Sequence, residues 1–60
     1  MEEQEWLKPI DVARLLGVPT RAVYRLIDEG ALPAYRFGRT IRLRAADVEA
    51  YRRRQGGAEP

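Results

Sequence analysis

The stretch from Val12 to Ile27 constrains the fold most, because it contains two short helical patterns on either side of a tight break. The apolar residues of each pattern follow the i, i+3, i+4 spacing of one helix face. They are Val12, Leu15 and Leu16 in the first pattern and Val23, Leu26 and Ile27 in the second. The break contains Gly17 and Pro19, and Ala13 places a small side chain where the second helix must cross closely. Two amphipathic helices joined by a short glycine-containing turn are typical of a helix-turn-helix.

The 60 residues limit the chain to one small domain. A domain of this size buries only about 60% of its unfolded surface, so its stability is marginal without further support. Cysteine and histidine are both absent, which excludes disulfides and zinc sites built on these residues. No secretory signal or membrane-spanning apolar run is present. We therefore expect a cytoplasmic, nucleoid-associated protein with no membrane contact.

The charge of the chain is unevenly distributed. Residues 1–11 have a net charge of −3, whereas residues 12–54 have a net charge of +6 that comes from ten arginines and four acidic residues. Arginine suits bidentate contacts to phosphate and guanine. A basic body therefore indicates a nucleic-acid partner, although solvated surface charge would give the same composition.

The first helix is expected over residues 9–16. Pro9 fits a first helical turn, where its missing N–H costs nothing, and Gly17 is suited to the left-handed position that ends a helix. Lys8 stands at the N-cap, although its side chain has no acceptor for an amide.

The residues before this helix divide into two parts. Residues 1–5 are polar and lack periodicity, which predicts a disordered acidic lead. We expect Leu7 to contact Val12 as a hydrophobic staple and Trp6 to cover the side of the core. An aromatic contact from Trp6 to a partner is the alternative.

The second helix is expected to begin at Pro19 and to reach Glu29, with Gly30 ending it. On a helical wheel its apolar residues cluster on one side. The exposed ridge then carries Arg21 and Arg25, with Thr20 and Tyr24 on its flanks. Such side chains suit a DNA major groove.

Residues 35–43 predict a β-hairpin, because apolar and basic residues alternate on both sides of a glycine-containing turn. A two-residue loop would place Phe37 and Ile41 on opposite faces. We therefore expect a three-residue loop of Gly38, Arg39 and Thr40. This register pairs Phe37 with Ile41 and Tyr35 with Leu43, and it places Arg36 and Arg42 together on the outer face. The hairpin becomes a wing with Arg39 at its tip, or alternatively a charged edge that resists aggregation.

The third helix is expected over residues 45–54. Asp47 and Glu49 lie in its early turns and the arginines at 52–54 in its last turn, which matches the helix dipole. Val48 and Tyr51 should close the core. The arginine run either stabilises the helix end or contacts phosphate. Residues 55–60 predict a flexible tail.

Three segments in this order and spacing resemble the excisionase-like, MerR-type winged helix-turn-helix DNA-binding domains. They read VARLLGV (12–18), VYRLIDEGALPAYRFGR (23–39) and IRLRAADVEAY (41–51), and the similarity extends from Leu7 to Tyr51. The resemblance implies a mainly α fold with a small β-hairpin, in the order α-α-β-β-α. We expect this domain to span residues 6–54.

The resemblance also implies that the second helix enters the major groove while the wing reaches the DNA backbone or minor groove. On the recognition helix it assigns Thr20, Arg21, Tyr24 and Arg25. On the wing it assigns Arg36, Gly38, Arg39, Thr40 and Arg42. The chain departs from the family at Lys8, where Ser or Thr is usual, and at Pro19, where Ser or Asn is common. Thr20 therefore either caps its helix or bonds a phosphate.

We expect a sequence-specific double-stranded DNA-binding protein that acts as a small transcriptional regulator. No cofactor, metal, small-molecule effector or catalytic constellation is expected. One alternative is an excisionase that bends DNA to direct recombination. Another is a protein-interaction adaptor that uses the acidic lead and Trp6. Because a single module has a small contact area, cooperative self-association on DNA is also expected.

Overall fold

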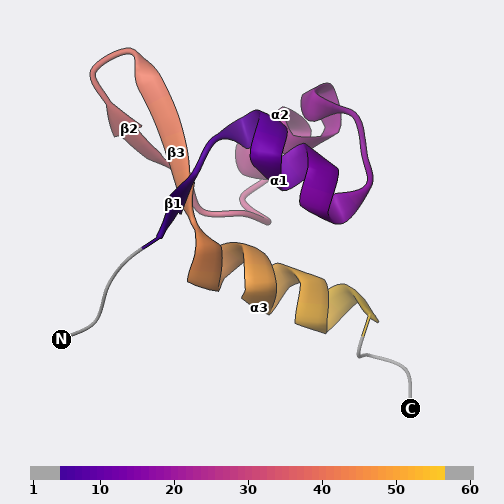
Figure 1. Ribbon diagram of the computed structural model, residues 1–60. Coiled ribbons are helices and arrows are strands. Elements are labelled where there is room, and N and C mark those ends of the chain that lie inside the picture. The colour runs from indigo at the N-terminus through magenta and orange to yellow at the C-terminus, as the bar shows by residue number, and fades with distance from the viewer. Residues whose placement is uncertain (1–4, 57–60) are drawn as a thin grey trace, which may run out of the picture.

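The computed structural model describes residues 5–56, and Figure 1 shows its course. The elements in chain order are β1 (Trp6–Leu7), α1 (Pro9–Leu16), α2 (Thr20–Asp28), β2 (Tyr35–Phe37), β3 (Thr40–Arg44) and α3 (Ala45–Gly56). The fold is a mainly helical winged helix-turn-helix with a small hairpin, which confirms the predicted class and order. The short strand β1 is an addition to that prediction.

Helix α1 has the predicted bounds because both of its ends are fixed locally. At its start, the backbone N–H of Lys8 donates to Asp11 Oδ2 over 3.3 Å, so an acidic side chain within the first turn binds the cap residue. At its end, Gly17 has a φ of 71°. The N–H groups of Gly17 and Val18 both donate to the carbonyl of Ala13, over 2.8 and 3.0 Å. Ala13 itself is buried against the core.

Helix α2 is one residue shorter at each end than predicted. Pro19 is its N-cap in an extended conformation (φ −68°, ψ 154°), so the first helical residue is Thr20. Gly30 follows the helix with a φ of 81°. The next residue, Ala31, donates its N–H to the carbonyl of Leu26 over 2.9 Å. The helix therefore ends at Asp28, and Glu29 is its C-cap residue.

The sheet has the order β1-β3-β2, with antiparallel pairing on both sides of β3. Strand β1 pairs Trp6 with Arg44 and Leu7 with Leu43. The N–H of Ala45 also donates to the carbonyl of Glu5 over 2.9 Å. Glu5 was assigned to the disordered lead, but this bond attaches it to the start of α3. The remaining residues of that lead, 1–4, lie outside the described part of the chain.

The predicted hairpin register is wrong. Only Gly38 and Arg39 form the loop, because Phe37 pairs with Thr40, and the next pairs are Arg36 with Ile41 and Tyr35 with Arg42. Arg36 and Arg42 therefore lie on opposite faces of the wing, and the four apolar residues do not share one face. Leu43 and Ile41 face the helices, whereas Tyr35 and Phe37 face outward.

Local turn chemistry explains the shorter loop. Gly38 has a φ of 67°, and no residue other than glycine in the range 5–56 has a positive φ. A glycine with positive φ at the first loop position is the type II′ arrangement, which favours two-residue hairpins. The hydroxyl of Thr40 also donates to the carbonyl of Phe37 over 2.8 Å and closes the turn.

Trp6 makes an apolar outer face possible. Its ring lies 5.4 Å from the Tyr35 ring and 5.2 Å from the Phe37 ring, centroid to centroid, and both contacts are edge-to-face. Trp6 therefore covers the outer face of the wing. The expectation that it would cover the side of the core was wrong. Half of the Phe37 side chain stays exposed (53%). These three residues are called the wing aromatic cluster below.

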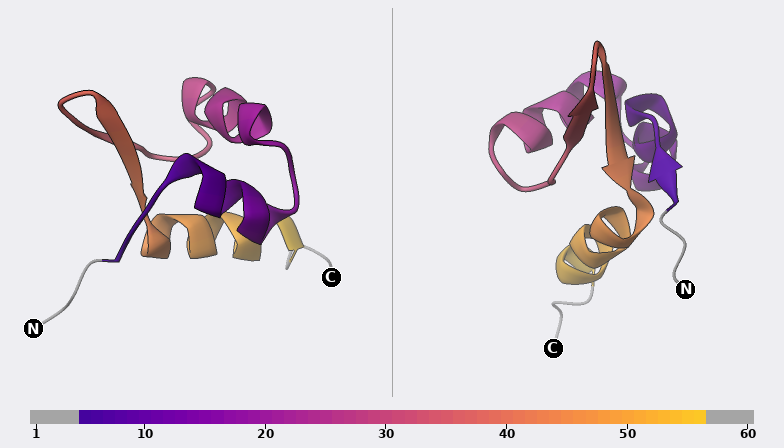
Figure 2. Two further views of the ribbon diagram at one scale, coloured as in Figure 1. Left: turned by 45° about the horizontal axis from the view of Figure 1, so that its top comes forward. Right: turned by 90° about the vertical axis from the view of Figure 1, so that its left-hand side faces the viewer.

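The core lies where α1, α2, β3 and α3 meet, and Figure 2 shows these elements around it. The residues that form it are Val12, Ala13, Val23, Leu32, Leu43 and Val48. Tyr51 and Leu7 pack against this cluster while remaining partly exposed. Helix α3 continues through Gln55 and Gly56, two residues beyond its predicted end, and the other residues of the predicted tail, 57–60, lie outside the described part of the chain. No helix in the described part of the chain is long and apolar enough to cross a membrane.

We predict that Trp6→Ala and Phe37→Ala destabilise the fold in a coupled manner. Edge-to-face aromatic pairs contribute about 0.5–1.5 kcal/mol beyond the area they bury. The double variant should therefore lose less free energy of unfolding than the sum of the single losses, by about that amount. Urea denaturation followed by circular dichroism measures it. Trp6→Ala combined with Leu15→Ala, at a distant exposed position, is the additive control.

Candidate functional site

A groove lies between α2 and the tip of the wing. Figure 2 shows that α2 and the tip project to the same side of the molecule, opposite α3. The groove has a volume of about 340 Å³. The residues that line it are Lys8, Pro9, Ile10, Thr20, Tyr24, Arg39, Thr40, Ile41 and Arg42. Parts of α1, α2 and the wing that are distant in sequence therefore share one surface, which is called the basic groove below.

Five of the nine candidate site residues meet in the basic groove. They are Thr20 and Tyr24 from α2 and Arg39, Thr40 and Arg42 from the wing. The Arg42 guanidinium donates to the carbonyl of Ile41 over 3.0 Å, which holds the side chain beside its own strand. The hydroxyl of Thr40 is already used within the turn. Thr20 follows a helix start with no side-chain cap, so the capping role considered for it is not seen.

The other candidate residues lie around the groove. Arg21 and Arg25 are exposed and line a separate hollow on α2, together with Pro19 and Ala22. Arg36 lies on the same face of the wing as Ile41, in a separate hollow that includes Ile27 of α2. The two-residue loop explains this separation, because it turns Arg36 and Arg42 to different faces.

The sequence interpretation missed four groove residues as site candidates: Lys8, Pro9, Ile10 and Ile41. Strand β1 pairs only with Leu43 and Arg44, so the chain leaves the sheet at Lys8. Helix α1 therefore begins beside residues 40–42 of β3, along the edge that β1 does not reach. Lys8 was noted only as a poor N-cap. Ile10 lies outside the apolar stripe of α1, and that position was the available signal that it is exposed.

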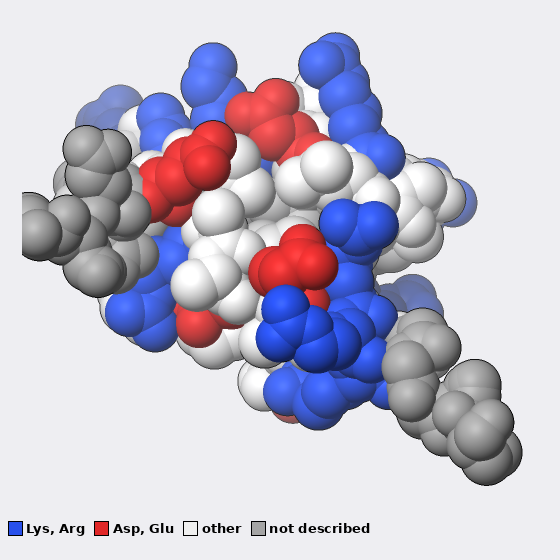
Figure 3. All heavy atoms as spheres, turned by 60° about the horizontal axis from the view of Figure 1, so that its bottom comes forward, with Lys and Arg blue, Asp and Glu red and all other residues white. Residues whose placement is uncertain are grey.

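The charges of the groove have one sign. Lys8, Arg39 and Arg42 contribute three cations, and none of its lining residues within the described chain is acidic. The face that contains α3 differs, because acidic side chains lie there among basic ones (Figure 3). The groove therefore presents a surface suited to a polyanion.

Comparison with known proteins agrees with this geometry. A family model described as a helix-turn-helix domain matches residues 6–56. The chain belongs to this excisionase-like helix-turn-helix family. The uncharacterized protein YvgK of Bacillus subtilis (strain 168) is 42% identical over 50 residues, which cover 83% of this chain and 16% of YvgK. No solved structure gives a significant match. The helix-turn-helix family is a family of DNA-binding domains.

Arg44 is held by other residues and lies outside the basic groove. Its guanidinium makes two bonds to the Asp47 carboxylate, Nε to Oδ2 over 2.8 Å and a second nitrogen to Oδ1 over 3.2 Å. It also lies 5.0 Å from the centre of the Tyr35 ring. The hydrogen bond to Asp47 raises the pKa of Arg44 above its usual value. Arg44 therefore joins the wing to the first turn of α3.

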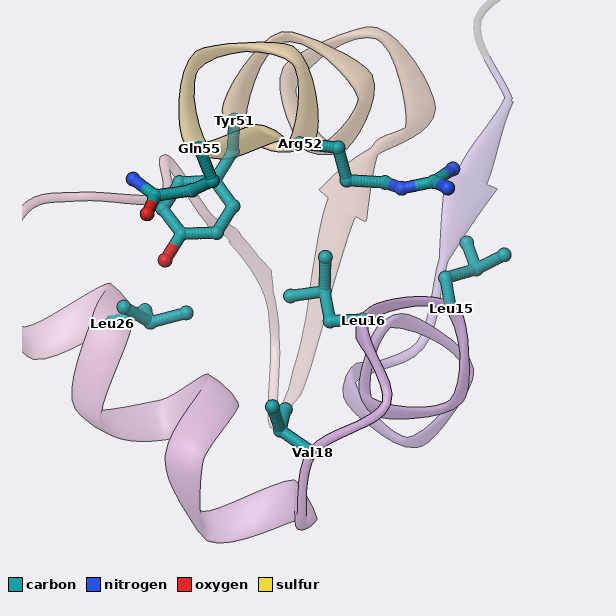
Figure 4. A pocket seen from close by; sticks show the side chains of 7 residues that line it. All are labelled: Leu15, Leu16, Val18, Leu26, Tyr51, Arg52 and Gln55. Carbon is teal, nitrogen blue, oxygen red and sulfur yellow. The ribbon is translucent and has the colours of Figure 1, made fainter. Parts of the chain in front are cut away.

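A second groove lies at the other end of the helix-turn-helix domain, between α1, α2 and the last turns of α3 (Figure 4). It is lined by Leu15, Leu16, Val18, Leu26, Tyr51, Arg52 and Gln55, with a volume of about 480 Å³. Leu15 is half exposed (50%). This surface, called the distal groove below, shares no residue with the basic groove.

We predict that Gly38→Ala destabilises the wing by about 1–2 kcal/mol, because an L-residue at positive φ is strained. A Cβ at this position would meet no atom within 4 Å, so the cost comes from the backbone alone. Gly38→Asn should cost a similar amount, because the first position of a type II′ turn suits glycine. Urea denaturation of both variants measures the losses. An unchanged free energy of unfolding for either variant would contradict this explanation.

Proposed function

We propose that the protein binds specific sequences in duplex DNA as a small transcriptional regulator, with α2 in the major groove and the wing on the backbone or minor groove. The main support is the basic groove, which joins the start of α2 to the wing tip on one side of the molecule. The protein acts by occupying its site, without catalysis, a cofactor or a small-molecule effector. It would work at the nucleoid in the cytoplasm.

The proposed contacts divide between bases and backbone. Thr20, Arg21, Tyr24 and Arg25 on α2 read base edges. Arg39 and Arg42 contact phosphate or the minor groove from the wing, supported by the turn at Gly38 and Thr40. Arg36 contacts the backbone from the other face of the wing. Base contacts determine sequence preference, whereas phosphate contacts mainly determine affinity.

Excisionase activity is the second candidate. The wing aromatic cluster and Arg44 fix the wing against the body, so the tip and α2 form two contact points with a set spacing. A rigid pair of contacts can bend a duplex that touches both. Gel mobility of a site placed at different positions along a fragment reports the bend. A bent complex favours the excisionase, whereas a straight complex favours simple occupancy.

We predict different losses for arginines on α2 and on the wing. Arg21→Ala or Arg25→Ala should cost about 1–3 kcal/mol at one base position if the arginine binds guanine through two bonds. Arg39→Ala should weaken binding to most sequences and reduce the salt slope by about one unit. Fluorescence anisotropy on a selected duplex and on random duplex, at several salt concentrations, measures both.

Arg14→Ala is the matched control, because it removes the same charge at an exposed position of α1 that lines neither groove. It should leave specificity unchanged. Equal losses for the α2 and wing variants on both duplexes would contradict the division of roles. If the wild type shows no salt-sensitive binding to duplex DNA, the protein-interaction adaptor is the better hypothesis.

Several copies are proposed to bind adjacent sites cooperatively. A single module buries only about 600–1,000 Å² on DNA, which gives limited affinity. The distal groove, with exposed Leu15, offers an apolar surface for a neighbouring copy. On a duplex with two or more adjacent sites, the wild type should give a Hill coefficient above one. Leu15→Lys should lower it while leaving single-site affinity unchanged, and a footprint of one isolated site at saturation would contradict the proposal.

A further inference from the structure

The basic groove contains an exposed apolar patch that its charges do not explain. Ile10 from α1 is 46% exposed and Tyr24 from α2 is 43% exposed, and both line the groove. Single exposed apolar residues are ordinary on protein surfaces. These two come from different helices, yet they face the same groove between three cations. A phosphate group would use the cations and leave the patch without a matching contact.

Duplex DNA offers one apolar group in its major groove, the C5-methyl group of thymine. The other edges of the bases present hydrogen-bond donors and acceptors there. The basic groove begins at the first turn of α2, the helix proposed to enter the major groove. An apolar patch in this position therefore matches the methyl group in both place and chemistry.

We propose that Ile10 and Tyr24 form a subsite for the C5-methyl group of a thymine in the target sequence. This inference rests on the proposed function and adds one base to what the protein reads. Ile10 contributes an aliphatic surface and Tyr24 a flat ring. Lys8, Arg39 and Arg42, which line the same groove, contact the neighbouring phosphates.

The fold keeps this subsite in place before DNA binds. Ile10 follows the buried Pro9 in the first turn of α1, and the bond from the Lys8 N–H to Asp11 fixes the start of that turn. Tyr24 directly follows Val23, which is fully buried in the core. The patch is therefore rigid at the backbone, which reduces the entropy that contact with a methyl group would cost.

Thymine and uracil differ only in this methyl group, so their exchange tests the subsite directly. A duplex with one site is first selected from a random pool with the wild-type protein. Each thymine is then replaced singly by deoxyuridine. Burying one methyl group is worth about a fourfold change in affinity. We expect wild-type binding to fall by about that factor at one or two positions and to be unchanged at the others.

Substitutions at Ile10 and Tyr24 test whether the difference between thymine and uracil comes from the apolar patch. Ile10→Ala should abolish the difference between thymine and uracil at the sensitive position, whereas Tyr24→Phe should keep it because the ring remains. Leu15→Ala is the matched control, because Leu15 is a similarly exposed residue of the same helix in the distal groove, and a duplex with one site has no neighbouring copy to contact it. It should keep the full difference.

Two results would overturn the subsite. One is wild-type binding that is insensitive to uracil at every position. The other is an Ile10→Ala variant that loses the same affinity on both duplexes, which would indicate contact with deoxyribose. Both results leave salt-sensitive duplex binding intact, so they are distinguishable from failure of the proposed function, in which that binding itself is absent.

Discussion

Strand β3 is the element on which the other parts depend, because it is paired along both edges. Strand β1 pairs with its last two residues and β2 with its first three. Its Leu43 side chain is fully buried between the sheet and the helices. At one end the strand becomes the wing tip, and at the other it continues directly into α3. A shift of β3 would therefore move the tip, the core and α3 together.

The helices whose ends are set by proline or glycine were predictable from the sequence. Pro9 and Gly17 bound α1 as expected, because proline and glycine have fixed backbone preferences that operate without tertiary contacts. The α2 start was misplaced by one residue since Pro19 is compatible with both the cap and the first turn. Base-contacting candidates on α2 followed from its helical period. Their individual roles remain predictions.

The hairpin register was not predictable from alternation alone. The predicted three-residue loop assumed that all four apolar residues of the hairpin pack against the same core. Here Tyr35 and Phe37 face outward because Trp6, about thirty residues earlier in the chain, covers them. A strand of two residues such as β1 has too short a pattern to be recognised. For the same reason the sequence did not place Ile10 in the basic groove, since that position depends on where the chain leaves β1.

The wing aromatic cluster has a practical consequence. Trp6 is the only tryptophan in the chain, and it contacts Phe37 directly beside the wing tip. Its indole is 39% exposed, so its fluorescence is sensitive to changes in nearby solvent. Tryptophan emission, excited where tyrosine does not absorb, thus reports on the wing and not on Tyr24 of α2. The native chain contains its own optical probe for the order in which its two proposed contact points would engage a duplex.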